Sequence, residues 1–530
     1  MWSIRFLLPF FLLLTAVLAA EDQTTLTSKK NLTIKATTGI YTGLIDPDFP
    51  NVRQFRSIAY AEPPIGKHRW LPPVPVGPSL RRSFAYRFPP SCPQYLTKNL
   101  TTWNSNITDF AIGVYGQSLT AGAMAQASSE DCLYLAIWTP TNATADSNLP
   151  VALFLPGGDF VSGGVDVTYQ KPTPWVQRTQ SHIVVTANYR VNIAGFPWAA
   201  GLEEQNVGIM DQRAALEWVY ANIGFFGGDN SRITLWGHSA GGVAVDIVSH
   251  AYHDNPLIAG MFMQSGTAMV NISYPDHSYG NFTFVAKNLG CDFPEDKIAE
   301  VDCMRHVPMT LIQNFMGQYR DNNTKPALSL FKPVPDEKRV FFNYTLRAQK
   351  GLSPKVPALV STTSNESATL SRYPLTNVTE GPYQPSVDAA TVGVFVCLAS
   401  NTTVSRQKNS LTTYRYEYAG NFSSITPLSW MGAYHASDVP MIFGTYARKQ
   451  GVTDLQRKVA ETMQDYILAF LEDPENGLKK KGWLPYGEGE GQKNMLRFAS
   501  GPGSQSIERN VSAAEVDDAC VLGKTHVFNP

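Results

Sequence analysis

The feature of this 530-residue chain that most limits its fold is the segment Ile233–Gly242, which reads ITLWGHSAGG. An apolar run typical of a buried strand leads into Gly-x-Ser-x-Gly, and an apolar helical pattern follows over Val243–Ser249. A turn this tight forces strained backbone angles on Ser239, and Gly237 and Gly241 omit the side chains that would clash across it. The strand, turn and helix together predict that Ser239 is a nucleophile.

A serine nucleophile needs a base, a carboxylate that orients the base, and donors for the oxyanion. The Ala240 amide, at the start of the helix, is the first expected oxyanion donor. In proteins with a serine in such a strand–turn–helix, the acid follows the serine in the chain and the histidine follows the acid. Of nine histidines, six follow Ser239: His250, His253, His277, His306, His435 and His526. The first three follow the turn too closely and His306 lies in the small Cys291 to Cys303 neighbourhood, so His435, in the loop-like segment Gly432–Asp438, is the best candidate.

Short apolar runs alternate with helical spacing along the middle of the chain. Buried strands are predicted at Val151–Leu155, His182–Thr186 and Ile233–Trp236. Helices are predicted around two sets of apolar residues, namely Met210, Leu216, Val219 and Ile223, and Leu455, Val459, Met463, Ile467 and Phe470. This alternation favours an α/β fold, with a mostly parallel central sheet and helices on both faces.

The charge balance excludes some classes of partner. Lys plus Arg number 43 and Asp plus Glu number 44, so the formal charge is −1, and no basic excess favours nucleic acid or anionic lipid. Apolar residues make up 43% and charged residues 16%, which predicts a chain with a large core.

The N-terminus carries the pattern of a secretory signal. Arg5 precedes an apolar run over Phe6–Ala20, followed by Glu21 and Asp22. The run is shorter than the roughly 20 residues that span a bilayer, so we expect residues 1–20 to be a cleaved signal peptide rather than a membrane anchor. No later segment looks long and apolar enough to span, which predicts a soluble mature protein of residues 21–530 without stable membrane insertion.

Glycosylation signals and cysteines support export. Thirteen N-x-S/T sequons begin at Asn31, Asn99, Asn106, Asn142, Asn271, Asn281, Asn322, Asn343, Asn365, Asn377, Asn401, Asn421 and Asn510. The chain has six cysteines, none in the C-x-x-C spacing of a zinc site: Cys92, Cys132, Cys291, Cys303, Cys397 and Cys520. In an exported chain they predict three disulfides, although spacing alone leaves 15 pairings open.

Several further segments, together with the nucleophile turn, resemble the signatures of the type-B carboxylesterase/lipase family, which includes the cholinesterases. They are Tyr60–Pro64, Glu130–Leu135, Ile137–Pro140, Asn188–Val191, Asp211–Arg213 and Phe226–Gly228. The likeness covers roughly residues 35 to 500. It implies an α/β-hydrolase fold in a single domain, with Ser239 as nucleophile and His435 as base. The family's acid is a glutamate, and Ser364–Ser367 matches its motif at Glu366, which implies that the Asn365 sequon is buried and unused.

The resemblance also implies a disulfide pattern. Cys92 with Cys132 would close a lid-like loop, Cys291 with Cys303 a small loop, and Cys397 with Cys520 the third bridge of cholinesterases. Two positions depart from the family: the glycine triplet of the oxyanion loop is Gly157-Gly158-Asp159, and His238 stands where glutamate usually precedes the nucleophile. Asp438, three residues after His435, stands where the family often has glutamate. It could support the catalytic residues from behind or be a solvated loop acid, and the sequence leaves both open.

These observations predict a secreted, N-glycosylated serine carboxylic-ester hydrolase that acts through an acyl-enzyme on Ser239 and needs no metal or cofactor. Amides of Gly158, Asp159 and Ala240 would bind the oxyanion, and the partner would be a small-molecule ester. The modest apolar surface of the lid-like loop favours soluble or moderately hydrophobic esters over triacylglycerol or sterol esters. A non-catalytic adhesion or binding protein of the same fold is the alternative of another class. Oligomeric state is not predicted.

Overall fold

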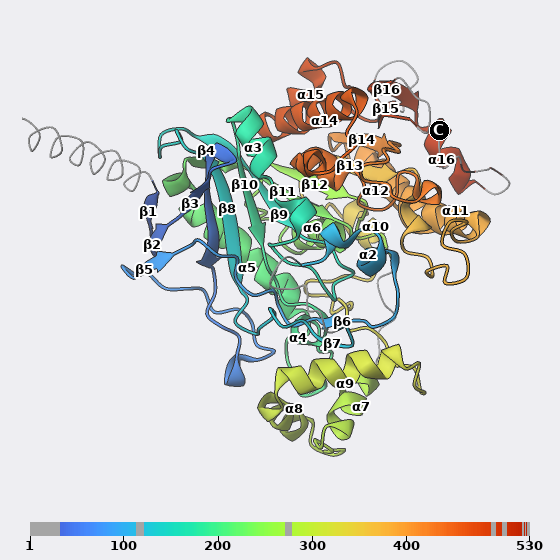
Figure 1. Ribbon diagram of the computed structural model, residues 1–530. Helices are drawn as coiled ribbons and strands as arrows, with labels where there is room; N and C mark the ends of the chain where they lie inside the picture. The colour runs from blue at the N-terminus through green and yellow to red at the C-terminus, as the bar shows by residue number, and fades with distance from the viewer. Residues whose placement is uncertain are drawn as a thin grey trace, which may run out of the picture.

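The computed structural model describes residues 32–112, 121–270, 278–488, 494–500 and 506–521, with residues 524 and 526. The expected signal peptide and the sequons at Asn31 and Asn271 lie outside these residues. The described residues form an 11-stranded sheet through the centre of the molecule (Figure 1). In spatial order its strands are β16 (Glu508–Ser512), β15 (Asn494–Phe498), β14 (Thr413–Tyr418), β13 (Ala358–Thr363), β12 (Gly260–Gln264), β11 (Gly228–His238), β9 (Leu149–Leu155), β10 (Ile183–Ala187), β8 (Tyr134–Pro140), β4 (Phe49–Ala59) and β3 (Leu44–Asp46).

The centre of this sheet is parallel, as the alternation of strand and helix predicts. Every neighbouring pair from β10 through β9, β11, β12, β13 and β14 to β15 is parallel. The antiparallel strands lie at the two edges, with β8, β4 and β3 on one side and β16 on the other. Two small sheets, β1 (Thr33–Ala36) with β2 (Gly39–Thr42) and β5 (Arg82–Phe84), and β6 (Tyr95–Leu96) with β7 (Ala123–Met124), lie apart from it.

Helices cover both faces of the sheet because successive strand residues point to opposite sides. Leu153 belongs to the core cluster formed with α5 (Val207–Asn222) and α6 (Ala240–Ala251). Phe154, the next residue, belongs to the cluster formed with α3 (Thr173–Thr179), α13 (Val439–Phe443) and α14 (Asp454–Glu472). The predicted α/β architecture is therefore confirmed, with α5, α6 and α14 over the segments where helical spacing indicated helices.

A helical lobe with its own apolar core projects from the sheet (Figure 1). It consists of α7 (Gly280–Asn288), α8 (Lys297–His306) and α9 (Met309–Asp321), and the Cys291–Cys303 disulfide joins the second half of α8 to the loop before this helix. The remaining short helices are α2 (Thr102–Ser105), α4 (Asn192–Gly195), α10 (Tyr344–Gln349), α15 (Gly477–Lys480) and α16 (Ala514–Asp517).

One long helix corrects an expectation from the sequence. α11 (Gln384–Thr391), a π-helical turn (Val392–Val396) and α12 (Cys397–Lys408) form one continuous helix. By length and composition this helix is apolar enough to cross a membrane, so the expectation that no later segment meets this criterion is wrong. The sequence shows no long apolar run here because polar residues such as Asp388 and Ser400 interrupt it, although the helix as a whole stays apolar. In the structure the Cys397–Cys520 disulfide joins it to the C-terminal segment, and buried Arg406 donates to the carbonyl of Val356.

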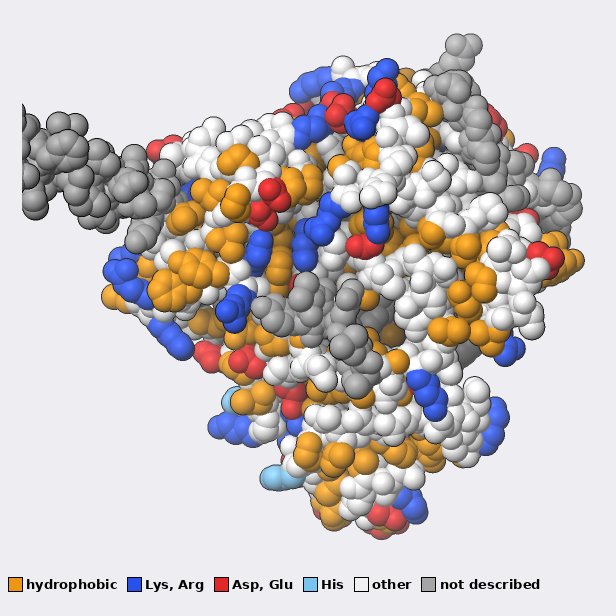
Figure 2. Space-filling view, viewed as in Figure 1, with side chains coloured by type: hydrophobic (Ala, Val, Ile, Leu, Met, Phe, Trp, Pro, Cys, Tyr) orange, Lys and Arg blue, Asp and Glu red, His pale blue; other side chains and the backbone are white. Residues whose placement is uncertain are grey.

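The surface agrees with the balanced charge of the chain. On the face shown in Figure 2, basic side chains lie among acidic and apolar ones rather than in a single basic patch. The three disulfides have the pairing that the family resemblance implies, Cys92–Cys132, Cys291–Cys303 and Cys397–Cys520.

Candidate active site

Ser239 lies in the turn between β11 and α6, with strained backbone angles (φ 56°, ψ −125°). The glycines around it are required by space. A Cβ on Gly237 would lie 2.2 Å from the carbonyl oxygen of Gly241, and one on Gly241 would lie 1.9 Å from that of Leu155. The Ser239 amide donates to the Gln264 carbonyl, which joins the turn to β12. The structure thus has the strained, half-buried serine at a helix start that the motif predicts.

Glu366 and His435, which the sequence separates by 69 residues, form a hydrogen-bonded pair. Nδ1 of His435 lies 2.5 Å from Oε2 of Glu366, and both side chains are buried. The other carboxylate oxygen, Oε1, accepts the Thr363 amide at 2.7 Å. The loop of His435 is held beside the acid because the Asn365 amide donates to the Ala433 carbonyl.

The neighbouring Asn365 is wholly buried. Its side-chain amide donates to the carbonyls of Trp430 and Met431, at 3.1 and 2.9 Å. Asn365 is therefore buried, as the family resemblance implies for this sequon.

Aromatic side chains surround the His435 ring. Phe395, from the π-helical turn, lies with its ring centroid 5.0 Å from that of His435, and Trp103 of α2 lies edge-on at 6.4 Å. Phe110 contacts Trp103 and also Tyr169, which brings a second ring of the lid-like loop to this region. The sequence analysis missed Trp103 and Phe395, because no motif marks them and only tertiary packing brings them to the histidine.

The loop after β9 lies directly against Ser239. A Cβ on Gly157 would lie 2.9 Å from Cβ of Ser239, and Gly158 has a positive φ of 123°. Asp159, where the family has a third glycine, also has a left-handed backbone (φ 57°). Its carboxylate accepts a hydrogen bond from Nζ of Lys332 at 2.6 Å. The acidic side chain therefore has a cationic partner, and no local pattern could have predicted a partner 173 residues away.

His238 and Asp438 are two further titratable groups beside the pair. The buried His238 ring lies 4.7 Å from that of His435, and burial lowers the pKa of His238 well below 6.5. Burial also raises the pKa of Asp438 to about 6, although the Tyr416 hydroxyl donates to its Oδ2 at 3.0 Å. Asp438 is wholly buried, so the open choice from the sequence is decided against a solvated loop acid.

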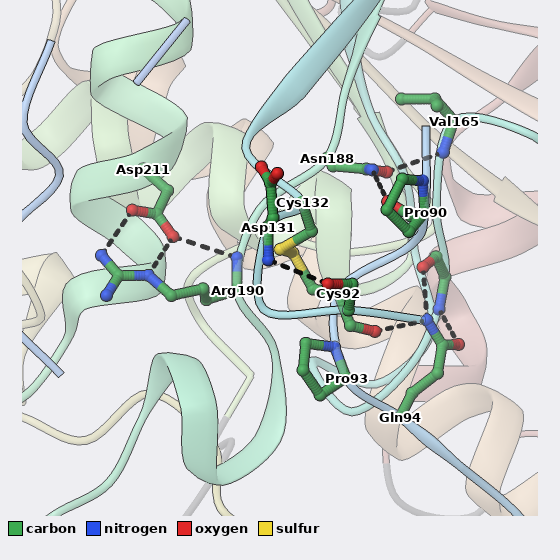
Figure 3. Close-up of a disulfide and its surroundings, with 12 residues drawn as sticks. Pro90, Cys92, Pro93, Gln94, Asp131, Cys132, Val165, Asn188, Arg190 and Asp211 are labelled. Carbon is green, nitrogen blue, oxygen red and sulfur yellow. Dashed lines mark hydrogen bonds and ion pairs between the residues drawn. A yellow bond between two sulfur atoms is a disulfide. The ribbon is translucent and has the colours of Figure 1, made fainter. Parts of the chain in front are cut away.

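The base of the lid-like loop is joined to the loop after β9 (Figure 3). Gln94, next to the Cys92–Cys132 disulfide, donates to the carbonyls of Cys92 and Gly163 and accepts the Gly163 amide, at 3.0 to 3.1 Å. The lid-like loop thus begins within hydrogen-bond reach of the segment that carries Gly158. Val114 and Tyr115, two of its expected apolar residues, lie outside the described part of the chain.

Two further family motifs, Asn188–Val191 and Asp211–Arg213, provide structural support for this centre. Arg190 and Asp211 form a buried two-fold ion pair with distances of 2.8 and 2.7 Å, and Asp211 also accepts the Arg190 amide (Figure 3). Asn188 accepts the Val165 amide and donates to the Pro90 carbonyl. These residues join the loops after β9 and β10 to α5, which explains why polar motif residues stand at buried positions.

The chain matches the carboxylesterase family over residues 30–389 and 377–517. A chlorogenic acid esterase of Aspergillus niger is 37% identical over 513 residues, which cover 93% of this chain and 95% of the relative. Secreted lipase 5 of Gibberella zeae is 36% identical over 548 residues, with 97% of each chain covered. An acetylcholinesterase of Danio rerio is 32% identical over 312 residues, 56% of this chain and 44% of the relative.

These matches agree with the central parallel sheet, the strained serine and the acid–histidine pair. The disulfides and the secreted relatives indicate an extracellular protein. The substrates of this class are small-molecule esters. The chain belongs to the carboxylesterase family of α/β-hydrolases and is a carboxylic ester hydrolase.

Proposed function

We propose that Ser239, Glu366 and His435 form the catalytic triad of a secreted serine esterase. The observation that carries this proposal is the buried 2.5 Å contact between Glu366 and His435. The His435 ring also packs against His238, the residue before Ser239. His435 accepts the proton of the Ser239 hydroxyl as the oxygen attacks the ester carbonyl, and then returns it to the leaving alcohol. Glu366 stabilises the imidazolium that forms between these steps.

The amides of Gly158, Asp159 and Ala240 are the proposed oxyanion donors. Ala240 begins α6, where amide groups have no partner within the helix and the helix dipole favours negative charge. The packing of Gly157 against Ser239 supports the contribution of the next two residues. Water then attacks the acyl-enzyme by the same route in reverse, with His435 as base.

Soluble esters with an aromatic or moderately hydrophobic group are the proposed substrates. Trp103 and Phe395 lie against the base, so a flat apolar group of the substrate would find aromatic partners there. The full-length similarity to a chlorogenic acid esterase supports this class. The expected result is a higher kcat/KM for an aromatic ester than for an aliphatic ester of equal size.

A lipase is the second candidate, and a specific observation favours it. Large apolar side chains are exposed near the long helix, at Leu370, Leu375, Tyr383 and Val394. Such a surface suits contact with a lipid aggregate. The two candidates differ in one assay: a lipase gains activity when its ester passes from solution to emulsion, whereas the proposed esterase does not.

Ser239→Ala is the decisive test of the triad. The serine lies in a turn and is only half-buried, so we expect normal secretion and thermal stability but at least about a thousandfold loss of kcat. The wild type should incorporate one equivalent of an organophosphate and the variant none. An unlabelled, inactive wild-type protein would instead indicate the non-catalytic alternative.

The proposal includes a cleaved signal at residues 1–20, a single domain over residues 21–530 and N-glycans at exposed sequons. Asn365 is expected to remain unmodified because its side chain is buried and hydrogen-bonded. Peptide mapping of the secreted protein, with and without deglycosylation, tests these three points together.

A further inference from the structure

The residue before the nucleophile is a histidine, and the triad proposed above does not use it. His238 ends β11, and its ring centroid lies 4.7 Å from that of His435 with the planes inclined at 44°. The side chain is buried, and its Nδ1 faces the loop after β9, because a Cβ on Gly157 would lie 3.3 Å from that nitrogen. His238 therefore lies between the oxyanion loop and the base.

The hydrogen bonding of His238 favours a neutral ring. An imidazolium carries two N–H donors, and each needs an acceptor when it is buried. Nε2 of His238 is buried and has no hydrogen-bond partner among the described residues. A charged His238 would leave this donor unpaired and place a second positive charge beside a protonated His435. Burial and the charge of His435 both lower the pKa of His238, in agreement with this geometry.

The other titratable groups near His435 come from three segments. Glu366, after β13, contacts Nδ1, and Asp438 lies three residues further along the same loop as His435. Tyr416 of β14 holds the carboxylate of Asp438. Among the described residues, Trp103 and Phe395 are the further rings in contact with His435, and they carry no charge. At position 238 a carboxylate would add a further negative charge beside the imidazolium, whereas a neutral histidine adds none.

We propose that His238 is a positioning residue that acts through His435: as a neutral neighbour it lets the base lose its proton at a lower pH than a carboxylate at this position would allow. The enzyme would thereby keep its activity to a lower pH than the same enzyme with a carboxylate at position 238. This inference rests on the proposed triad. It concerns the protonation of His435 and adds no chemical step to the reaction.

Two substitutions at one position test the proposal. His238→Gln keeps a neutral hydrogen-bonding side chain, and His238→Glu introduces the charge. In the pH profile of kcat/KM for a neutral ester, we expect the acid limb of the Gln variant to coincide with that of the wild type. The Glu variant should have its acid limb about one to two pH units higher, because a negative charge about 5 Å from the imidazolium stabilises the protonated form.

A matched surface variant and a direct titration complete the experiment. His306→Glu makes the same change of charge on an exposed residue of α8 and should leave the acid limb in place. Proton NMR of the His435 ring measures its titration directly, independently of catalysis. The titration midpoints of the wild type and the two variants should follow the same order as their acid limbs. If the acid limb of the Gln variant moves to higher pH, His238 is charged in the wild type. If the acid limb of a folded Glu variant does not move, the charge at position 238 does not affect His435, and the proposal is wrong.

Failure of the proposed function has a different signature. If Ser239 is not the nucleophile, Ser239→Ala retains hydrolysis, whatever the position of the acid limb. Active-site titration with an organophosphate, together with the thermal midpoint of each variant, separates loss of folded enzyme from a change in protonation. If the Glu variant does not fold, the Gln variant still tests whether His238 is neutral. A neutral His238 predicts an unchanged acid limb for the Gln variant, and a charged His238 predicts an acid limb at higher pH.

Discussion

Glu366 uses its two carboxylate oxygens for different tasks. Oε1 accepts the Thr363 amide and Oε2 contacts Nδ1 of His435. These two contacts set the position of Glu366, the proposed acid, and the tautomer of His435, the proposed base, since Nδ1 must carry the proton that faces the carboxylate. At the residue scale, then, the orientation of the base depends on one side chain whose own orientation is set by the backbone of β13.

Glu366→Gln is expected to fold but to lose about a thousandfold or more in kcat. The glutamine oxygen would accept the Thr363 amide, so its NH2 group would face Nδ1 of His435. That donor favours the wrong tautomer, with the proton on Nε2, and it does not stabilise an imidazolium. Steady-state kinetics normalised by active-site titration, with the thermal midpoint as control, provide the measurement. Near-normal kcat would show that Glu366 is not the acid.

Asp159 has a backbone conformation that suits glycine and a side chain that is paired with Lys332. Asp159→Gly should therefore change kcat by less than about fivefold, because a partly exposed ion pair contributes at most about 1 kcal/mol. Lys332→Met, measured alongside, removes only the cation. A hundredfold rise in kcat for Asp159→Gly would instead mean that the wild-type carboxylate opposes the developing oxyanion.

At the scale of elements, several hydrogen bonds join the lid-like loop to the helical lobe, and three of them converge on one carboxylate. Asp321, the last residue of α9, accepts hydrogen bonds from the Tyr95 hydroxyl, the Thr97 hydroxyl and the Lys98 amide, at 2.9, 2.6 and 2.9 Å. The same loop carries Trp103 against the base. The position of an aromatic ring at the active site thus depends on the attachment of the loop to a helix outside the sheet.

Asp321→Ala is expected to loosen this loop while the sheet stays folded. Three donors lose their acceptor, and each loss costs about 1 kcal/mol or more when the donor is shielded from water. Limited proteolysis should cut residues 92–132 several-fold faster, and KM for an aromatic ester should rise. Asp302→Ala removes an exposed carboxylate of α8 and serves as the control. Unchanged proteolysis would show that other contacts hold the loop.

At the scale of the whole molecule, a buried carboxyl group couples folding to pH. The pKa of Asp438 is raised by burial from 3.8 to about 6. Its protonation therefore stabilises the folded state fully below about pH 3.8, and this contribution is lost as the pH rises through about 6. By linkage, a shift of this size corresponds to about 3 kcal/mol between the two limits.

Asp438→Asn should remove this dependence. The difference in thermal midpoint, variant minus wild type, should be more positive at pH 8 than at pH 5. The reason is that the wild type buries an ionised carboxylate only at the higher pH. Scans at the two pH values measure the difference, with Asp254→Asn at an exposed position as the control. An equal difference at both pH values would show that Asp438 does not titrate in this range.

Much of the fold, and the turn at Ser239, can be predicted from interactions between residues that are close in the sequence. The turn at Ser239 follows from glycine sterics within one segment, and the strands and helices around it follow from apolar spacing that the structure confirms. Glu366 and the disulfide pairing followed from family motifs rather than from physics. In each of these cases the signal lies in neighbouring residues or in the motifs of the family, so no knowledge of distant contacts is needed.

Tertiary structure alone decided what surrounds the triad. The partner of Asp159 is Lys332, and the rings against His435 come from Trp103 and Phe395, segments that the chain separates widely. The burial that perturbs His238 and Asp438 also depends on packing between elements. The fold class and the turn at Ser239 can be predicted from the sequence, because they depend on short-range sterics and periodicity. The charge and aromatic environment of the base depended on which distant side chains the folded sheet brings together, and residue spacing does not encode this.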